Sequence, residues 1–285
     1  MTTKLVSKTL KVLMAIALRA KGDPKCKFTS LAHLLTEDFL KECFRELKRG
    51  KSPGTDGVTV GEYAKALDEN IADLVARLKA KQYKPQPVLR VYIPKPNGEK
   101  RPLGIPAVED KIVQMALKKI LEAIFEQDFI DTSYGFRPNR SCHDALTELD
   151  RIIMNVPVNF VVDMDISKFF DTVDHKRLME CLRQRIVDPT LLQLIGRFLK
   201  SGIMEEGKYF EMDQGTPQGG VLSPVLANVY LHYVLDKWFE NEVLPQLTGF
   251  ARLIRYADDC VPRSCTRDEG LAPRSLLAGA GFKPP

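Results

Sequence analysis

The sequence predicts an α+β fold. Long segments carry apolar residues at helical spacing, a few short runs are rich in β-branched and aromatic residues, and strands do not alternate regularly with helices. Hydrophobic residues make up 44% and charged residues 28% of the 285 residues, which is typical of a globular chain and not of a disordered one. A chain of this length can bury a sizeable core, so two lobes are expected.

The first third of the chain predicts mostly helices. The apolar run VLMAIAL near the start predicts an amphipathic helix and not a signal peptide, because no clear small-residue cleavage site follows it. In TEDFLKECFRELKRG, Thr36 is a helix N-cap and Gly50 ends the helix. The loop KSPGTDGVTV follows, and the apolar residues from Tyr63 to Leu78 then recur at helical spacing.

The remaining elements are a hairpin, several helices and three further strands. In PVLRVYIPKPNGEKRPLGIP two extended runs meet at Asn97-Gly98, a pair typical of hairpin turns. VEDKIVQMALKKILEAIF predicts a long helix, and NFVVDMDI and KYFEM predict strands. Asp174 and Asp188 are N-caps of two short helices. A helix opens at Ser223 and runs to about residue 240, and GFARLIRYADDCV predicts the last strand and a turn.

Positive charge is concentrated in one window. From Arg77 to Arg101 there are eight Lys or Arg residues and a single acid, Glu99, so this window carries +7 while the whole chain carries +5. A basic stripe on a near-neutral body is the electrostatic footprint of a polyanion partner. The alternative is a solvated helix face.

The spacing of the cysteines and the length of the apolar runs indicate in which compartment the protein is expected. The six cysteines, at positions 26, 43, 142, 181, 260 and 265, show no CxxC spacing, which argues against a structural zinc site or a disulfide framework and favours the cytoplasm. No apolar run reaches the roughly 18 residues that a membrane span needs, so no membrane partner is expected.

Four carboxylates raise a chemical question. Asp163 and Asp165 are two residues apart, so on a strand they would share a face. Asp258 and Asp259 are adjacent at the end of another apolar run. If the two strands are neighbours, the carboxylates converge and need a divalent cation such as Mg²⁺ to offset their repulsion. Two such ions about 4 Å apart can activate an attacking hydroxyl and stabilise a leaving oxygen. An isolated DD pair, in contrast, is more often a solvated turn.

Several blocks resemble the reverse transcriptases encoded by group II introns. These are VYIPKPNGEKRPLGIPAVEDKIVQMAL, SYGFRPNRSCHDAL, DMDISKFFDTVDH, TPQGGVLSPVLANVYLHYVLDKW and RYADD, in the order of that family. FTSLAHLLTEDFLKECFRELKRGKSPGTDGVTV is similar to the extension that precedes its fingers, so the resemblance covers roughly residues 28–260. It implies a right-hand polymerase fold and an RNA-directed DNA polymerase that uses two Mg²⁺ ions.

The resemblance implies the catalytic and metal-binding residues. Asp165 matches the palm aspartate that binds both metals, and Asp258 and Asp259 match the pair of the YxDD turn. The metal-facing role falls to Asp165 and Asp258, with Asp259 tuning charge and supporting the turn. The backbone carbonyl of Ile166 completes a metal shell. Asp163 has no match in the family and is interpreted as a local hydrogen-bond acceptor.

The resemblance also implies the nucleotide site. Lys95 and Arg101 match fingers residues that grip the triphosphate, since cations offset the charge of a transferring phosphoryl group. Phe170, five residues after Asp165, matches the ring that excludes a 2′-hydroxyl. Gln218 and Gly219 match the loop beside the nascent base pair.

The expected partners are an RNA template with its primer, deoxynucleotides and group II intron RNA. Relatives in this family bind their own intron RNA and assist its splicing. Arg77, Lys79, Lys81 and Lys84 would track phosphates independently of sequence. Arg137, in GFRPNRS, fits template contact, although an intramolecular salt bridge explains it equally well.

These matches divide the chain into five segments. They are an N-terminal helical segment (1–35), the extension and start of the fingers (36–84), the fingers with palm-connecting helices (85–157), a partial palm with the catalytic aspartates (158–261) and a tail (262–285). The last 25 residues contain four Pro and three Gly and match no block of the family, so the tail is expected to be disordered.

The resemblance ends just past the DD pair. Pro262 has no N–H to donate, so it is expected to interrupt the second arm of the DD hairpin. The thumb of the family is expected to be absent, and a frameshift just after the motif is the hypothesis that explains this. Two alternatives follow: a catalytically inactive remnant that at most binds RNA, and a related palm enzyme such as a nucleotide cyclase, against which the fingers blocks and TPQGG argue.

Overall fold

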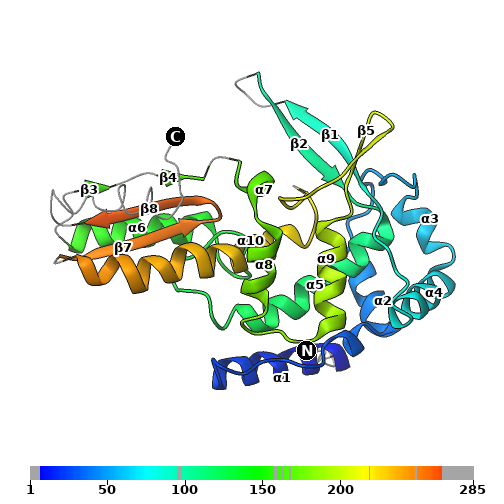
Figure 1. Cartoon of the computed structure of the whole chain (residues 1–285), viewed down its shortest axis with the longest axis horizontal. Coiled ribbons are helices and arrows are strands. Elements are labelled where there is room, and N and C mark those ends of the chain that lie inside the picture. Colours follow the sequence, from blue (N-terminus) through cyan, green and yellow to red (C-terminus); the bar gives the residue numbers. More distant parts are fainter. Residues whose placement is uncertain are drawn as a thin grey trace, which may run out of the picture. The chain divides into compact units, whose positions relative to one another are not determined.

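The computed structural model of the chain describes residues 7–94, 98–156, 160–161, 164–166, 168–217, 219–247 and 249–264. It confirms the α+β class, and the chain divides into two compact units (Figure 1). Unit 1 comprises Met1–Asp128 and Phe170–Ser223, and unit 2 comprises Phe129–Phe169 and Pro224–Pro285. The predictions for Lys95, Asp163, Gln218 and the segment 265–285 fall outside the described residues.

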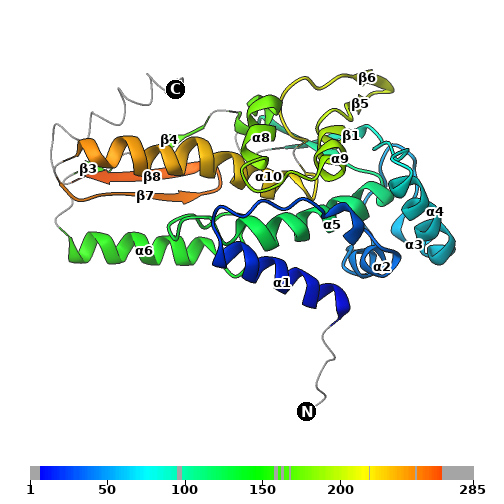
Figure 2. The same ribbon diagram turned by 60° about the horizontal axis from the view of Figure 1, so that its bottom comes forward.

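The helices of unit 1 are built around α5 (Val108–Phe125). Eight of its apolar side chains have no exposed surface, as expected for a helix with apolar residues on several sides. Helices α1 (Lys8–Gly22) and α2 (Glu37–Arg45) pack against it (Figure 2). Neither α5 nor any other helix of the described residues is long and apolar enough to cross a membrane. The other helical segments of this unit are a 3-10 turn (Ala32–Leu34), α3 (Val60–Ala64), α4 (Leu67–Lys79), α8 (His175–Leu182) and α9 (Pro189–Leu199), with α7 (Phe169–Thr172) where the chain passes between units.

The three predicted N-caps are confirmed. Thr36, Asp174 and Asp188 each accept a backbone N–H from the first turn of α2, α8 and α9, respectively. Asp188 also accepts the N–H groups of Leu31 and Ala32 at 2.6 and 2.8 Å, so one carboxylate ties α9 to the N-terminal segment. Burial of Asp188 opposes its charge, but the backbone N–H donors outweigh burial and hold its pKa below the ordinary value.

The sheet of unit 1 contains the predicted hairpin. Strands β1 (Val88–Pro94) and β2 (Lys100–Ile105) pair antiparallel, and β5 (Ile203–Glu205) pairs parallel with β1. Strand β6 (Lys208–Phe210) completes the order β2-β1-β5-β6. Strand β5 was not predicted, because three residues are too few to show a period of two.

Unit 2 is a sheet with helices on both faces. Strand β8 (Asp259–Ser264) pairs with β7 (Ala251–Tyr256) on one side and with β3 (Phe160–Val161) and β4 (Met164–Asp165) on the other. Helix α6 (Cys142–Asn155) covers one face, and α10 (Ser223–Leu231) with its continuation covers the other (Figures 1 and 2). That continuation consists of π-helical turns at His232–Asp236 and Phe239–Val243 and a 3-10 turn at Leu244–Gln246.

The prediction that Pro262 interrupts the second arm of the hairpin is wrong. Strand β8 continues through Pro262 to Ser264, and Pro262 lies opposite Leu253 of β7. On the other side of β8, Asp259 and Cys260 pair with β4, and Arg263 and Ser264 pair with β3 in the same register. Proline has no N–H to donate, but its neighbours Val261 and Arg263 are paired with Ile254 and Arg252 of β7, so the strand continues past it.

A buried carboxyl in α5 makes stability depend on pH. Asp110 is 2% exposed and accepts from the Tyr83 hydroxyl and, at 3.0 Å, from the Gln86 N–H. Burial raises the pKa of Asp110 to about 7, whereas an unfolded Asp has a pKa of about 3.9. Between these values the folded state holds a proton that the unfolded state lacks, so this carboxyl makes stability fall as pH rises from about 4 to 7.

We expect Asp110→Asn to remove this contribution, because asparagine cannot ionise. Its side-chain oxygen can accept the Gln86 N–H, and its NH2 group can donate to the Tyr83 oxygen. In urea titrations from pH 4 to pH 7, the variant should gain stability relative to wild type as pH rises, by at most about 1.4 kcal/mol per pH unit. Glu211→Gln, at an exposed site, is the control and should follow wild type. Parallel curves for Asp110→Asn and wild type would contradict the prediction.

Candidate active site

The predicted carboxylates of unit 2 meet at the end of a hairpin. Strand register places Asp165 of β4 directly opposite Asp259 of β8, and Asp259 in turn lies opposite Tyr256. Paired residues share one face of a sheet, and all three of these side chains are exposed. Asp258 lies in the turn between β7 and β8 and is partly buried. The sequence favoured Asp165 and Asp258 as the metal-facing pair, whereas the register makes Asp165 and Asp259 the direct neighbours.

This arrangement suits a hard divalent cation. Like charges directly opposite each other destabilise a sheet, and a cation between Asp165 and Asp259 would relieve that repulsion. Among the described residues, no group of three or more His, Cys, Asp or Glu side chains is gathered closely enough to hold a metal by itself. Mg²⁺ commonly uses only one or two carboxylates and takes further ligands from substrate phosphates. The Ile166 carbonyl accepts the Phe169 N–H at 3.2 Å, which leaves it one lone pair.

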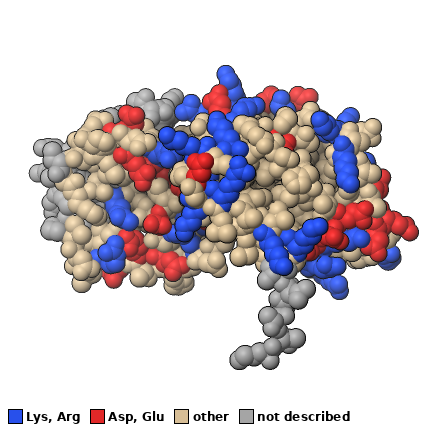
Figure 3. Space-filling model, turned by 90° about the horizontal axis from the view of Figure 1, so that it is seen from below, with Lys and Arg blue, Asp and Glu red and all other residues tan. Residues whose placement is uncertain are grey.

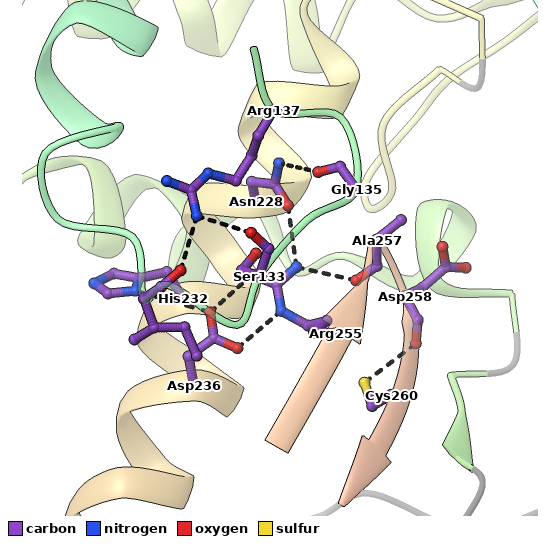
Figure 4. A network of polar contacts seen from close by, with 11 residues as sticks. Ser133, Gly135, Arg137, Asn228, His232, Asp236, Arg255, Ala257, Asp258 and Cys260 are labelled. Atoms are coloured by element: carbon purple, nitrogen blue, oxygen red, sulfur yellow. Dashed lines mark hydrogen bonds and ion pairs between the residues drawn. The ribbon is translucent and has the colours of Figure 1, made fainter. Parts of the chain in front are cut away.

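A buried ion pair supports the hairpin from the other face of the sheet (Figure 4). Arg255 of β7 has no exposed surface, and its Nε and Nη2 donate to the two carboxylate oxygens of Asp236 at 2.8 and 2.7 Å. Its Nη1 donates to the Asn228 side-chain oxygen and to the Ala257 carbonyl, both at 3.0 Å. The guanidinium therefore fixes the residue that immediately precedes Asp258.

The backbone around Ala257 is also tightly held. Ala257 has a φ of 60°, and a Cβ built on Gly135 would lie 2.2 Å from the Ala257 nitrogen, so only glycine fits at position 135. Asn228 donates to the Gly135 carbonyl at 2.9 Å. The Cys260 thiol donates to the Asp258 carbonyl at 3.4 Å, and burial raises its pKa to about 12.

Arg137, for which the sequence left template contact and an intramolecular salt bridge open, is buried in unit 2. Arg137 is 7% exposed, and its Nη1 donates to the carbonyls of Ile130 and Ser133, both at 2.8 Å. Its guanidinium also lies over the Phe129 ring, 5.2 Å from the centroid. With these hydrogen bonds and this ring contact, the Arg137 side chain supports the fold of unit 2. His232 is packed against the same ring, and burial lowers its pKa to about 3, so it is neutral.

In unit 1, the loop that contains TPQGG is held by the segment of the expected sugar gate. The Thr216 N–H donates to the Phe170 carbonyl at 2.7 Å, and the Gly215 N–H donates to the Val173 carbonyl at 2.8 Å. The His175 ring is hydrogen-bonded through Nε2 to the Gly215 carbonyl at 2.6 Å. Phe170 itself is half-buried.

The far end of this loop contacts β2 and α5. Gly219 has a φ of +108°, and a Cβ there would lie 2.8 Å from the carbonyl oxygen of Gly104 in β2. The Gln114 side chain of α5 accepts the Val221 N–H at 2.9 Å. Arg101 is exposed on β2, opposite Ile93. The loop, the base of the hairpin and the segment of Phe170 therefore form one connected structure.

The described cations of the predicted basic stripe differ in their surroundings. Arg77 is paired with Asp73 and Glu109, each at 2.7 Å, so its charge is already compensated. Lys79 and Lys81 line a cavity of about 220 Å³, and Lys84 lines a groove next to it, since Arg197 lines both. On the face shown in Figure 3, basic and acidic side chains are interspersed.

Sequence reasoning missed the residues that support these sites. Gln114 and His175 hold the loop, and Arg255, Asn228 and Asp236 hold the hairpin. The RYADD block includes Arg255, but nothing in its local sequence indicates that its partner is a carboxylate 19 residues earlier. A buried arginine needs such a partner, so its position in an apolar strand was the available signal.

Comparison with known proteins agrees with the resemblance found in the sequence. Residues 93–277 match the sequence profile of a family described as reverse transcriptase (RNA-dependent DNA polymerase), so the match includes part of the segment after Val261. The group II intron-encoded protein LtrA of Lactococcus lactis subsp. cremoris is 40% identical over 232 residues, 81% of this chain and 38% of LtrA. Protein YkfC of Escherichia coli is 36% identical over 278 residues, 86% of this chain and 73% of YkfC. The chain thus spans about 38% of the length of LtrA.

Proposed function

Because this chain belongs to the reverse transcriptase family, and within it to the group II intron-encoded proteins, we propose that it adds deoxynucleotides to a primer on an RNA template. The observation that carries the proposal is the pair of exposed carboxylates, Asp165 and Asp259, directly opposite each other beside Asp258. Like charges directly opposite each other repel, a cation between them relieves the repulsion, and a cation with open coordination positions can bind phosphate oxygens.

The carboxylates of Asp165, Asp258 and Asp259, with the Ile166 carbonyl, would hold two Mg²⁺ ions. When bound, such ions activate the attacking hydroxyl and stabilise the leaving oxygen. The Arg255–Asp236 pair keeps the hairpin turn in place through the Ala257 carbonyl. The acidic residues would thus position the metal ions and offset their positive charge.

The residues of unit 1 would bind and select the nucleotide. The charged groups of Lys95 and Arg101 would bind the triphosphate and offset its charge. The Phe170 ring would exclude a 2′-hydroxyl, and the loop with Gln218 and Gly219 would lie beside the new base pair. The hydrogen bonds from Thr216 and Gly215 to the backbone of the Phe170 segment support this role, because they couple the loop to the gate.

The direct test is primer extension by the purified chain on an RNA template with deoxynucleotides and Mg²⁺. Extension that requires the template and disappears with a chelator is the expected result. If a folded preparation binds RNA but extends no primer under these conditions, the proposal is overturned in favour of a chain that only binds RNA. Group II intron RNA is the proposed natural partner, and the same preparation can be tested for its binding.

Phe170→Ala should weaken discrimination against ribonucleotides. A smaller side chain leaves room for the 2′-hydroxyl, and loss of such a steric contact changes discrimination by about tenfold or more. The measurement is the ratio of kcat/KM for a deoxynucleotide to that for the matching ribonucleotide. Phe170→Tyr, which keeps the ring, should retain the wild-type ratio. An unchanged ratio in Phe170→Ala would rule out the gate.

A further inference from the structure

Unit 1 contains a groove of about 1170 Å³ that has no assigned function. Helices α8 and α9, which lie side by side in Figure 1, form it together with β6 and the segment before β1. None of its lining residues belongs to the loop or hairpin proposed to hold the nucleotide. Small-molecule pockets usually measure about 300–1,000 Å³, so the size of this groove favours a segment of a polymer as its occupant.

The charge of the groove is all of one sign. Its lining includes the cations Lys27, Lys84, Arg183, Arg197 and Lys200, and no Asp or Glu is among the described residues that line it. Within the described part of the chain, none of these five cations has a carboxylate oxygen within 4.0 Å. Uncompensated cations from distant parts of the sequence form a local field that attracts an anionic partner.

One of these cations is held rigidly. Arg197 donates through Nη1 to the carbonyls of Lys81 and Tyr83, at 2.9 and 2.7 Å. Carbonyls fix its orientation without neutralising its charge. Its side chain therefore loses little freedom when it binds an anion.

Helix dipoles explain only part of this arrangement. Arg183 and Lys200 follow the last residues of α8 and α9, where cations are favoured in any protein. Lys27 and Lys84 belong to no helix, so this explanation does not extend to them. The convergence of both pairs on one groove points to a ligand.

An aromatic ring lies at the edge of this basic groove. Tyr209 of β6 lines the groove and is 50% exposed. A Cβ on Gly202 would lie 2.4 Å from its ring, so the ring packs closely against the glycine backbone while half of the residue stays exposed. A fixed, half-exposed ring next to cations is the combination with which proteins bind single-stranded nucleic acid, the ring stacking on a base and the cations contacting phosphates.

We propose that this groove binds a single-stranded RNA segment, with its phosphates on the cations and a base on Tyr209. The choice of RNA as the strand rests on the proposed function. An acidic peptide would satisfy the cations but would gain nothing from the ring. A duplex would keep its bases stacked on one another and would also leave the ring unused.

The first test measures the salt dependence of binding. Fluorescence anisotropy with labelled U12 RNA, in EDTA and without nucleotides, gives the slope of log Kd against log salt. Each phosphate contact to a single strand contributes about 0.7 to this slope, so the double variant Arg183→Gln/Lys200→Gln should reduce it by about 1.4. The matched control is Arg49→Gln/Lys51→Gln, which removes the same charge from exposed positions outside the groove, and its slope should match that of wild type. An unchanged slope in the groove variant, or an equal loss in the control, would overturn the proposal.

The second test separates stacking from charge. Tyr209→Ala should weaken U12 binding by about fivefold or more, whereas Tyr209→Phe, which keeps the ring, should bind as wild type does. If Tyr209→Ala binds normally, the ring is not a platform. Two competition experiments test the type of ligand. If an equally charged poly-glutamate peptide, or duplex RNA, displaces labelled U12 as effectively as unlabelled U12 does, the assignment is also overturned. Since binding is measured without Mg²⁺ or deoxynucleotides, the outcome is independent of whether the chain polymerises.

Discussion

Replacing Arg255 with methionine is expected to destabilise unit 2 by about 3–5 kcal/mol, because it leaves the Asp236 carboxylate buried without its partner. Both side chains have no exposed surface. The change also removes donors from the Asn228 side chain and the Ala257 carbonyl. The measurement is the urea midpoint of unfolding at constant m-value.

The matched control is an exposed ion pair in the same unit. Arg151 donates to Glu148 at 2.8 Å, and its side chain is 60% exposed. Arg151→Met should therefore destabilise the chain far less than Arg255→Met does, because water already screens an exposed pair. Equal destabilisation by Arg255→Met and Arg151→Met would contradict the structural importance of the buried pair.

A double variant distinguishes stability from positioning. Arg255→Met/Asp236→Leu removes both charges, and apolar replacement of a buried ion pair is often neutral for stability. It does not restore the hydrogen bond to the Ala257 carbonyl. We therefore expect a fold of near wild-type stability with reduced primer extension, its loss appearing in kcat more than in KM. Full extension by the double variant would show that Arg255 acts only through stability.

Primer extension should fall by about a hundredfold or more in Asp165→Asn, because loss of a metal-binding carboxylate removes several kcal/mol of transition-state stabilisation. The same change relieves repulsion between Asp165 and Asp259, which lie directly opposite. Without divalent cations, Asp165→Asn should thus be as stable as wild type or more stable, by up to about 1 kcal/mol. Loss of activity with no loss of stability separates this role from a structural one.

The other two carboxylates can be ranked by the same assays. Asp258→Asn should lose extension as Asp165→Asn does, and Asp259→Asn should lose less if it mainly tunes charge. Mg²⁺ should raise the Tm of wild type by binding the folded state, and Asp165→Asn should lack this shift. A full Mg²⁺-induced shift in Asp165→Asn would remove that carboxylate from the metal site. Asp163→Asn tests the remaining acidic residue and is expected to extend normally.

Local patterns in the sequence determined much of the fold. Helix α5, the β1–β2 hairpin and the N-caps Thr36, Asp174 and Asp188 were predicted because each depends on residues close together in the chain. Boundaries were less accurate: α2 ends at Arg45 and not at Gly50, and the helix predicted from Tyr63 to Leu78 is divided into α3 and α4. Helix ends depend on tertiary packing as well as on caps.

Ordered blocks in the sequence also determined the family and identified the acidic residues, because a motif consists of particular residue types at fixed spacing along the chain. Only the tertiary structure decided their neighbours. It placed Asp165 opposite Asp259, continued β8 through Pro262, and buried Arg137 on carbonyls. It also brought Lys27, Lys84 and Lys200 to one groove. The physical reason is that register, burial and charge compensation depend on partners far away in the chain, and a local pattern carries no information about which distant residues will meet.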